Sequence, residues 1–241
     1  MMGALDGKTM LVTGGSSGIG KACTTRYRAE GATVFVADLH PRSSDELALD
    51  VGDPAAWEAL IASLPPLDAV HLNAGIITPG RNIGDGSVLP LSDITDASYR
   101  STMGANVDGV FFGARAVLAS MAERGQGDII VTASIAGLSG MGGDVVYTTT
   151  KHAVVGLVKA LGASLTAQGL DICVSALCPG FVDTPLIAGT VKELVTAFGV
   201  PIIEPDRVAE AAMQILEARV NGSQWIVWDE VIRQHTEPEL L

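Results

Sequence analysis

The sequence predicts an α/β domain built on a doubly wound, seven-stranded parallel sheet with helices on both faces. Short apolar runs bounded by Gly, Asp or Asn alternate with longer stretches whose apolar residues recur at helical spacing. Most of the short runs are apolar throughout, as strands covered on both faces require. The 241 residues contain no internal repeat and no long linker, so we expect a single domain spanning residues 1–241.

The elements follow from these patterns in chain order. Seven strands are expected at Thr9–Val12, Thr33–Ala37, Leu47–Val51, Ala69–Asn73, Asp128–Thr132, Ile172–Leu177 and Trp225–Trp228. Five helices are expected at Ile19–Glu30, Pro54–Ser63, Ala97–Arg124, Val145–Gln168 and Asp206–Ala218. Several of these helices start at or after Asp, Pro or Ser, as helix N-termini prefer.

The composition excludes several classes of function. The chain has 15 Lys and Arg against 27 Asp and Glu, a formal charge of −12, which argues against nucleic acid and against an anionic membrane surface. No apolar run reaches the roughly 18 residues of a membrane span, and the first residues do not resemble a signal peptide, so we expect a cytoplasmic protein. The three cysteines are odd in number and widely spaced, which predicts reduced thiols and no metal site.

Two segments stand outside the strand and helix pattern. Residues Thr78–Leu91 are rich in Gly and Pro and are expected to form a surface loop. Residues Thr184–Ile203 are densely apolar between two prolines, and we interpret them as a lid over a largely apolar site. Packing of this segment on the core or on a neighbouring subunit is the alternative.

The first strand leads into a glycine-rich turn, MLVTGGSSGIGKA, and then a helix. Glycines let the backbone approach phosphates, and helix N-terminal amides donate to them, so the turn favours a pyrophosphate over a plain connection. Asp38 ends the next strand 18 residues after Gly20, where a ribose-binding acid belongs. Its charge repels a 2′-phosphate, which favours NAD over NADP, although Arg42 is near enough in sequence to keep some NADP use open.

Several motifs together carry a family resemblance. The glycines follow TGxxxGxG in Thr13–Gly20, NAG follows the fourth strand, and ANVDG, VTASIAG, YTTTK and CPGFVDT come in that order. Over nearly its whole length, the chain resembles the short-chain dehydrogenase/reductase family, which implies a Rossmann-like fold. In this family's pattern the segment between Asp38 and Asp50 usually includes a helix, and here it is short enough to predict only a turn.

The resemblance implies a cofactor site and its residues. Backbone near Val182 and Thr184 would bind the carboxamide, with a plain strand-ending turn at Pro179 as the alternative. The expected NAD-binding residues are Gly14, Ser16, Ser17, Gly18, Ile19, Gly20, Asp38, Leu39, Asp50, Val51, Asn73, Ala74, Gly75, Tyr147, Lys151, Pro179, Gly180, Val182 and Thr184. Cys178 is expected to be a buried strand residue rather than a nucleophile.

Oxidation of an alcohol requires a base, and a tyrosine needs its pKa of about 10 lowered by roughly 2 to 3 units to act near neutral pH. Tyr147 and Lys151 lie four residues apart on one helix face, so the ammonium can favour the phenolate. The resemblance implies that Ser134 holds the substrate oxygen and that Lys151 also binds the nicotinamide ribose. The resemblance also implies that Asn106 holds a water molecule that links Lys151 to solvent. The alternative is that Asn106 bends the helix and satisfies backbone groups there.

The expected function is therefore NAD-dependent hydride transfer to or from a secondary alcohol or ketone, such as a hydroxysteroid or hydroxyacyl compound. A catalytically silent NAD-binding sensor or scaffold is the alternative. Lys151 and the complete glycine turn argue against a dehalogenase-type lyase, and the glycine spacing and the chain length argue against a sugar epimerase.

The resemblance implies a homo-oligomer, a dimer or tetramer. The tail Arg233–Leu241 is either a frayed end or an arm. Gly142, Gly143 and Asp144 predict flexibility beside the substrate entrance.

Overall fold

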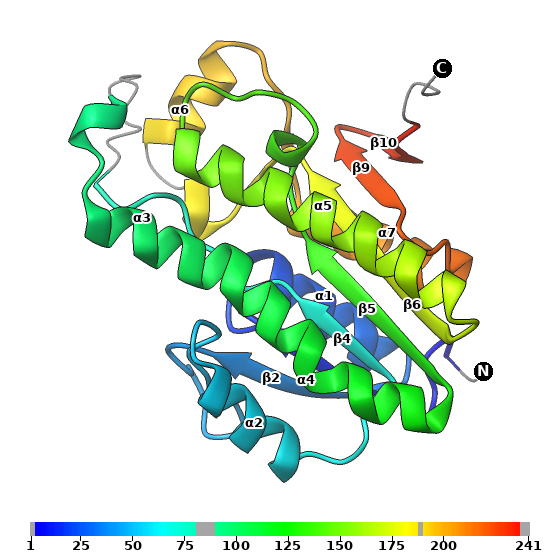
Figure 1. Ribbon diagram of the computed structural model, residues 1–241. Coiled ribbons are helices and arrows are strands. Elements are labelled where there is room, and N and C mark those ends of the chain that lie inside the picture. Colours follow the sequence, from blue (N-terminus) through cyan, green and yellow to red (C-terminus); the bar gives the residue numbers. More distant parts are fainter. Residues whose placement is uncertain (1–2, 81–89, 188–189, 237–241) are drawn as a thin grey trace.

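The computed structural model describes residues 3–80, 90–187 and 190–236. Its centre is an eight-stranded sheet in the order β10-β9-β6-β5-β4-β1-β2-β3, parallel except for the pairing of β10 with β9 (Figure 1). The strands are β1 Thr9–Thr13, β2 Thr33–Asp38, β3 Leu47–Ala48, β4 Ala69–Leu72, β5 Gln126–Thr132, β6 Asp171–Pro179, β9 Gln224–Trp228 and β10 Val231–Gln234. A Rossmann-like α/β fold with a mostly parallel sheet is therefore confirmed.

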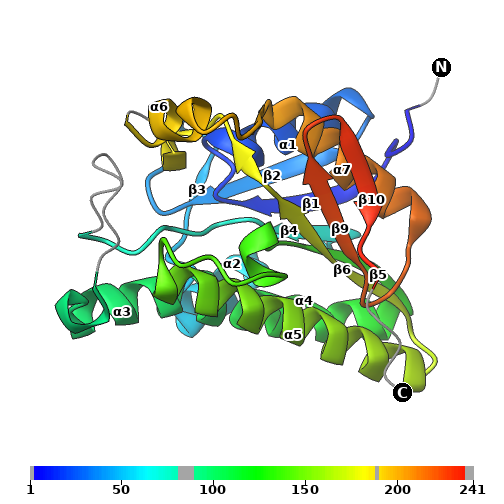
Figure 2. The same ribbon diagram turned by 90° about the horizontal axis from the view of Figure 1, so that it is seen from above.

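Helices cover both faces of the sheet (Figure 2). The long helices are α1 Gly18–Ala29, α2 Pro54–Ser63, α3 Asp96–Met103, α4 Gly109–Arg124, α5 Val145–Ala167 and α7 Pro205–Ala218. One apolar cluster packs α2, α4 and α5 against the sheet, with Trp57 and Met121 fully buried. The other packs α1 and α7 on the opposite face around Met10 and Tyr27. Within the described ranges, none of the helices has the length and apolar character that crossing a membrane demands.

The strand order creates a switch point. The chain runs outward from β1 to β2 and β3, and then returns to the other side of β1 and continues through β4, β5 and β6. The carboxyl ends of β1 and β4 therefore border a crevice, which is where open α/β sheets bind their ligands. Residues 39–46 between β2 and β3 contain no helix, as the short connection predicted.

The structure adds one strand, β10, to the seven predicted for the central sheet, and two further short strands form a separate two-stranded sheet. The last two residues of β10 belong to the segment that was predicted as a tail. β10 pairs antiparallel with β9, and Asp229 in the tight connection between them has a φ of 51°. Arg233 and Gln234 are thus part of the sheet rather than a frayed end. Residues 237–241, which include the two terminal leucines, lie outside the described residues.

The helix predicted over Ala97–Arg124 is a single rod with an irregularity. Between α3 and α4, residues Gly104–Asp108 form a π-helical turn that carries Asn106. Such turns place one extra residue in the rod and occur often at functional sites. Thr95 caps the start of α3, and Gly125 ends α4 in the left-handed conformation with a φ of 73°.

The two irregular segments differ from their predicted roles in detail. The predicted loop Thr78–Leu91 is described only at its ends, and Thr78 is buried rather than at the surface. The remaining short elements are η2 Leu91–Asp93, η4 Ile135–Gly137, β7 Phe181–Val182, η5 Pro185–Ile187, α6 Thr190–Ala197 and β8 Ile202–Ile203. β7 and β8 pair in parallel and close the base of the segment predicted as a lid.

Candidate active site

A cleft of about 770 Å³ opens at the carboxyl ends of the strands, within the size range of small-molecule sites. The glycine-rich turn after β1 borders one end of the cleft, and Tyr147 and Lys151 on α5 border the other. Thr184 and the η5 segment lie across it, together with the buried Val195 of α6. The cleft thus joins the two groups of residues that the sequence singled out.

Close packing explains the glycines of the turn. Gly14 has a φ of 62°, and a Cβ added there would lie 2.9 Å from the Ala74 Cα. A Cβ on Gly20 would lie 2.3 Å from the Gly14 carbonyl oxygen, so a side chain at either position would force the turn open. Ser17, at the N-terminus of α1, makes no side-chain capping bond to the helix among the described residues, and Ser17, Gly18 and Ile19 line the cleft. This arrangement fits an anionic phosphate group.

Asp38 ends β2 beside this turn. Its Oδ2 accepts from the Ser16 backbone N–H at 3.3 Å, and its Oδ1 accepts from the His40 N–H at 3.0 Å. Leu39 is 58% exposed next to it and offers no charge to a phosphate. The half-buried carboxylate therefore faces the cleft at the position predicted for a ribose acid.

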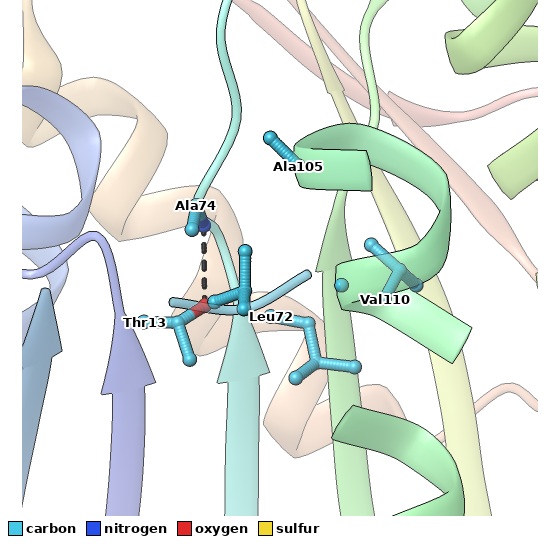
Figure 3. Close-up of a pocket in the computed structure, with 7 residues that line it drawn as sticks. Thr13, Leu72, Ala74, Ala105 and Val110 are labelled. Atoms are coloured by element: carbon cyan, nitrogen blue, oxygen red, sulfur yellow. Dashed lines mark hydrogen bonds between the residues drawn. The ribbon is translucent and has the colours of Figure 1, made fainter. Parts of the chain in front are cut away.

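A small pocket beside the main cleft shows how β1 and β4 are joined (Figure 3). The Thr13 hydroxyl accepts from the backbone N–H of Ala74 at 3.1 Å and from that of Asn73 at 3.0 Å. Ala105 and Val110 of the adjoining helix face this junction in Figure 3. The Asn73 side chain donates to the Thr13 and Gly14 carbonyls, so it ties the strand end to the glycine turn.

A buried polar chain supports Asn73 from below. Thr132 donates from Oγ1 to Asn73 Oδ1 at 3.0 Å, so its hydroxyl must accept from His71 Nε2 at 2.8 Å. His71 Nδ1 then accepts from the Tyr27 hydroxyl at 3.0 Å. Each group has one possible role, which fixes the tautomer of the fully buried imidazole. Burial lowers the pKa of His71 to about 3, so it remains neutral.

Tyr147 and Ser134 both line the cleft and lie within hydrogen-bonding reach of each other. Removal from water raises the pKa of Tyr147 to about 12, while a hydrogen bond with Ser134 lowers it and the Asp144 carboxylate raises it. The Ser134 hydroxyl also accepts from the Ala136 N–H at 3.1 Å. From the sequence we expect the pKa of Tyr147 to be lowered below 10, and in the structure it is raised above 10. Burial has a larger effect than the hydrogen bond that favours the phenolate.

Lys151 is buried between strand and helix. Its Nζ donates to the Thr132 carbonyl at 2.9 Å and lies 5.4 Å from the centre of the Tyr147 ring. Burial lowers the pKa of Lys151 to about 8. A Cβ on Gly75 would lie 3.1 Å from Asn106 Oδ1, a tight approach, and 3.6 Å from this Nζ, an ordinary contact.

Asn106 does not line the main cleft. Its Oδ1 accepts from the Ile76 N–H at 2.8 Å, and its Nδ2 donates to the Ile76 carbonyl at 2.9 Å and to Thr150 Oγ1 at 3.0 Å. The side chain therefore joins the π-helical turn, the segment after β4 and α5. These bonds match the alternative in which Asn106 satisfies backbone groups at a helix irregularity. Its third partner, Thr150, directly precedes Lys151 in the chain.

Asp144 is a site residue whose role the sequence analysis missed. Its buried carboxylate caps α5 by accepting from the Tyr147 N–H at 3.0 Å, and it also accepts from the Thr78 hydroxyl at 2.7 Å and the Thr78 N–H at 3.0 Å. These hydrogen bonds tie Asp144 to α5 and to Thr78, while the flexibility predicted for Gly142, Gly143 and Asp144 stays a prediction. An aspartate three residues before Tyr147 was a capping signal that could have been used.

The predicted carboxamide end lies where β6 leaves the sheet. A Cβ on Gly180 would lie 2.6 Å from the Trp228 ring, so β9 packs directly against this turn. The Ser134 hydroxyl lies 3.5 Å from the Pro179 carbonyl. Val182 and Thr184 line the cleft, and Cys178 is fully buried in β6 with its pKa raised to about 12.

The cleft brings together most of the predicted residues. Ser16, Gly20 and Asn106 are not among its lining residues, and the remaining cofactor and catalytic residues line it. Among the described residues, no cluster of His, Cys, Asp and Glu could hold a metal ion, and all three cysteines are buried free thiols. The turn, Asp38 and the strand ends together fit a dinucleotide cofactor.

Comparison with known proteins identifies the family. A family model described as short chain dehydrogenase matches residues 8–194. The chain belongs to the short chain dehydrogenase family. A 2-keto-3-deoxy-L-fuconate dehydrogenase of Xanthomonas campestris pv. campestris is 35% identical over 201 residues, and the match covers 79% of this chain but only 63% of that relative.

Two other similarities cover more of the compared protein. A 3-alpha-(or 20-beta)-hydroxysteroid dehydrogenase of Mycobacterium bovis is 35% identical over 201 residues, with 77% of this chain and 73% of that protein covered. The crystal structure of levodione reductase matches with a TM-score of 0.79 and 25% identity over 93% of this chain and 97% of that one. The short chain dehydrogenase fold therefore extends over nearly the whole chain.

Proposed function

We propose that this protein is an NAD-dependent alcohol dehydrogenase or carbonyl reductase in which Tyr147 acts as acid and base. The observation that carries the proposal is that Ser134, Tyr147 and Lys151 line the same cleft as the glycine turn and Asp38. Family membership and the dehydrogenases and reductases among the relatives support it. NAD in place of NADP rests on the carboxylate of Asp38, which repels a 2′-phosphate.

The chain's own residues divide the chemical work. Ser134 orients the substrate oxygen beside the Tyr147 phenol, which takes the hydroxyl proton in oxidation and returns it in reduction. Lys151 keeps a positive charge near the phenol and favours its ionised form. Asn106 and Thr132 hold the surroundings of Lys151 in place through the contacts described above.

The bound nicotinamide supplies the hydride acceptor or donor for this reaction. The phosphates would lie against the α1 N-terminus and the glycines of the turn, and the adenosine ribose would lie against Asp38. Asp50 and Val51 would border the adenine, and Pro179, Gly180, Val182 and Thr184 would border the carboxamide. These assignments follow the family's pattern and the shape of the cleft.

The substrate that suits the cleft is neutral and largely apolar. Beyond Tyr147 the wall is formed by Ile76, Ile77, Met141, Phe181, Leu186 and Val195. Lys151 is the one lysine or arginine among the described lining residues, and its ammonium is buried against Thr132. We therefore favour a secondary alcohol or ketone of hydroxysteroid or hydroxyacyl type, with residues Thr184–Ile203 as the lid. Action in the cytoplasm as a homo-oligomer, a dimer or tetramer, is part of the same proposal.

The test follows NADH absorbance at 340 nm while purified protein and NAD⁺ meet a panel of alcohols that includes hydroxysteroids, cyclic diols and a sugar acid. Tyr147→Phe should lose about 10³-fold or more in turnover and should still bind NADH. Tyr99→Phe is the matched control, because Tyr99 is 48% exposed on α3 and outside the cleft. Turnover that survives in Tyr147→Phe would overturn the assigned base.

Two further results would redirect the proposal. If NADH binds tightly and no member of the panel reacts, the sensor or scaffold function becomes the better description. Faster turnover with the sugar acid than with any neutral alcohol would contradict the apolar substrate class and leave the catalytic assignment in place.

A further inference from the structure

The short connection between β2 and β3 folds back onto the glycine-rich turn. Glu46, the last residue of this connection, reaches the Ser16 hydroxyl, which donates to Glu46 Oε2 at 2.6 Å. The same oxygen accepts from the Arg42 backbone N–H at 2.6 Å. The contact joins residues 30 positions apart, and it brings a second carboxylate to the glycine-rich turn, although Glu46 itself is not among the residues that line the cleft.

Ser16 lies between two carboxylates. Its backbone N–H donates to Asp38 Oδ2 at 3.3 Å, and its hydroxyl donates to Glu46. The residue is only 5% exposed and is not among the residues that line the cleft. Both of its hydrogen-bond donors are therefore occupied by acidic groups, and neither is available to a phosphate near the ribose.

Glu46 carries its charge at neutral pH. The hydrogen bonds from the Arg42 N–H and the Ser16 hydroxyl lower the pKa of its carboxyl group, although the neighbouring Asp38 and Asp45 raise it. Arg42 contributes its backbone to this contact, and among the described residues no ion pair joins its guanidinium to Glu46. The Arg42 N–H and the Ser16 hydroxyl thus hold the carboxylate of Glu46, and within the described part of the chain the guanidinium of the adjacent arginine does not pair with it.

We propose that Glu46 is a second specificity-determining residue of the cofactor site, which excludes a 2′-phosphate together with Asp38. The proposal rests on the proposed NAD-dependent function. A ribose 2′-phosphate carries between one and two negative charges and requires donors or cations around it. Glu46 adds a like charge and also keeps the Ser16 hydroxyl from acting as a donor. A free 2′-hydroxyl carries no charge and is unaffected.

The experiment measures the dissociation constants of NADH and NADPH by the fluorescence of the reduced nicotinamide. Glu46→Gln keeps the shape and the acceptor oxygen of the side chain but removes its charge. We expect NADPH to bind about five- to tenfold more tightly at low salt and less so at high salt, because salt screens such charges. NADH should bind within about twofold of the unchanged protein.

Two variants separate charge from other effects. Glu58→Gln removes one charge from an exposed position on α2, outside the cleft, and should change neither constant. Ser16→Ala removes the hydroxyl but leaves Glu46 held by the Arg42 N–H, so NADPH should still bind weakly. Melting temperatures establish that each variant is folded.

Three results would overturn the inference. If Glu46→Gln leaves NADPH binding unchanged while Asp38→Asn improves it, then Asp38 alone determines the preference. If Ser16→Ala improves NADPH binding as much as Glu46→Gln, the cause is the freed turn rather than the charge. If the unchanged protein binds neither NADH nor NADPH, the proposed function fails, and the inference fails with it.

Discussion

The two ends of the cleft are built from different kinds of interaction. At the glycine turn, Asp38 and Glu46 are partly exposed carboxylates that accept from backbone and from Ser16. At the α5 end, Lys151 and Ser134 are buried, and most of their partners are carbonyls, hydroxyls and amides. Water and salt screen charges at the first end, whereas the second end responds mainly to burial. We therefore expect selection of the cofactor to be graded and salt-dependent, and proton transfer to be far more sensitive to single changes.

The largest effect should follow removal of the buried ammonium. Lys151→Met is expected to lower kcat/KM by about 10³-fold, because the phenol loses its only nearby cation among the described lining residues. Steady-state kinetics with the best alcohol would measure it. Lys159→Met, two turns further along α5 and outside the cleft, is the control. A loss smaller than about tenfold would mean that the buried end tolerates change as readily as the exposed end.

The next effect concerns the buried chain below Asn73. His71→Leu removes the acceptor of the Tyr27 hydroxyl and the donor to Thr132 Oγ1, and it should lower the free energy of unfolding by about 2–4 kcal/mol. Chemical denaturation at pH 8 measures this loss. His152→Gln, an exposed histidine of α5, should leave the stability nearly unchanged.

The same histidine predicts a pH dependence of stability. Burial lowers the pKa of His71 from 6.5 to about 3, so at intermediate pH the unfolded chain binds a proton that the folded protein does not. Its contribution to stability is therefore complete above pH 6.5 and is lost as the pH falls toward 3. Denaturation curves at several pH values should show this component in the unchanged protein and not in His71→Leu. An equal slope in both proteins would refute it.

A smaller effect is expected at the exposed end. Asp38→Ala should weaken NADH binding by about tenfold or more and reduce the discrimination against NADPH, because the ribose hydroxyls lose a charged acceptor. Fluorescence titrations at low and high salt would measure both changes. If the discrimination is independent of salt, the contrast drawn between the two ends is wrong.

The smallest effect should follow removal of the Asp144 charge, which acts on Tyr147 at the buried end of the cleft. The Asp144 carboxylate raises the pKa of Tyr147, so Asp144→Asn should move the acid limb of alcohol oxidation to lower pH by up to about one unit. The asparagine oxygen can still accept from Thr78 and from the N-terminus of α5. Profiles of kcat/KM against pH measure the shift, with Asp93→Asn as an exposed control. A shift to higher pH would contradict the assigned influence of Asp144.

The sequence predicted the features that depend on local spacing. Short apolar runs predicted the seven parallel strands, although the third covers only Leu47–Ala48 instead of Leu47–Val51. Tyr147 and Lys151, four residues apart on one helix, both line the cleft. The glycine turn after the first strand and the position of Asp38 at the end of the second strand also followed from local pattern and spacing. The connection after Asp38 was short enough to exclude a helix, and the structure has none over residues 39–46.

Contacts between distant residues could not be predicted in this way. The Ser16–Glu46 bond depends on how far a loop folds back, and the Tyr27–His71 bond depends on which helix covers which strand. A polar residue such as His71 inside an apolar run carries no signal for its partners. β10 was missed because its polar residues sit at a sheet edge, where little burial is required of them.

The π-helical turn at Gly104–Asp108 shifts the helix register. One extra residue in a turn rotates everything beyond it by about 100° relative to an uninterrupted α-helix. The apolar faces of α3 and α4 therefore follow two separate phases, and a single helical wheel drawn over Ala97–Arg124 misassigns one of them. Deleting one residue, Val107, would restore a uniform helix, and it would turn either Asn106 away from Ile76 or Gly113 away from Trp57.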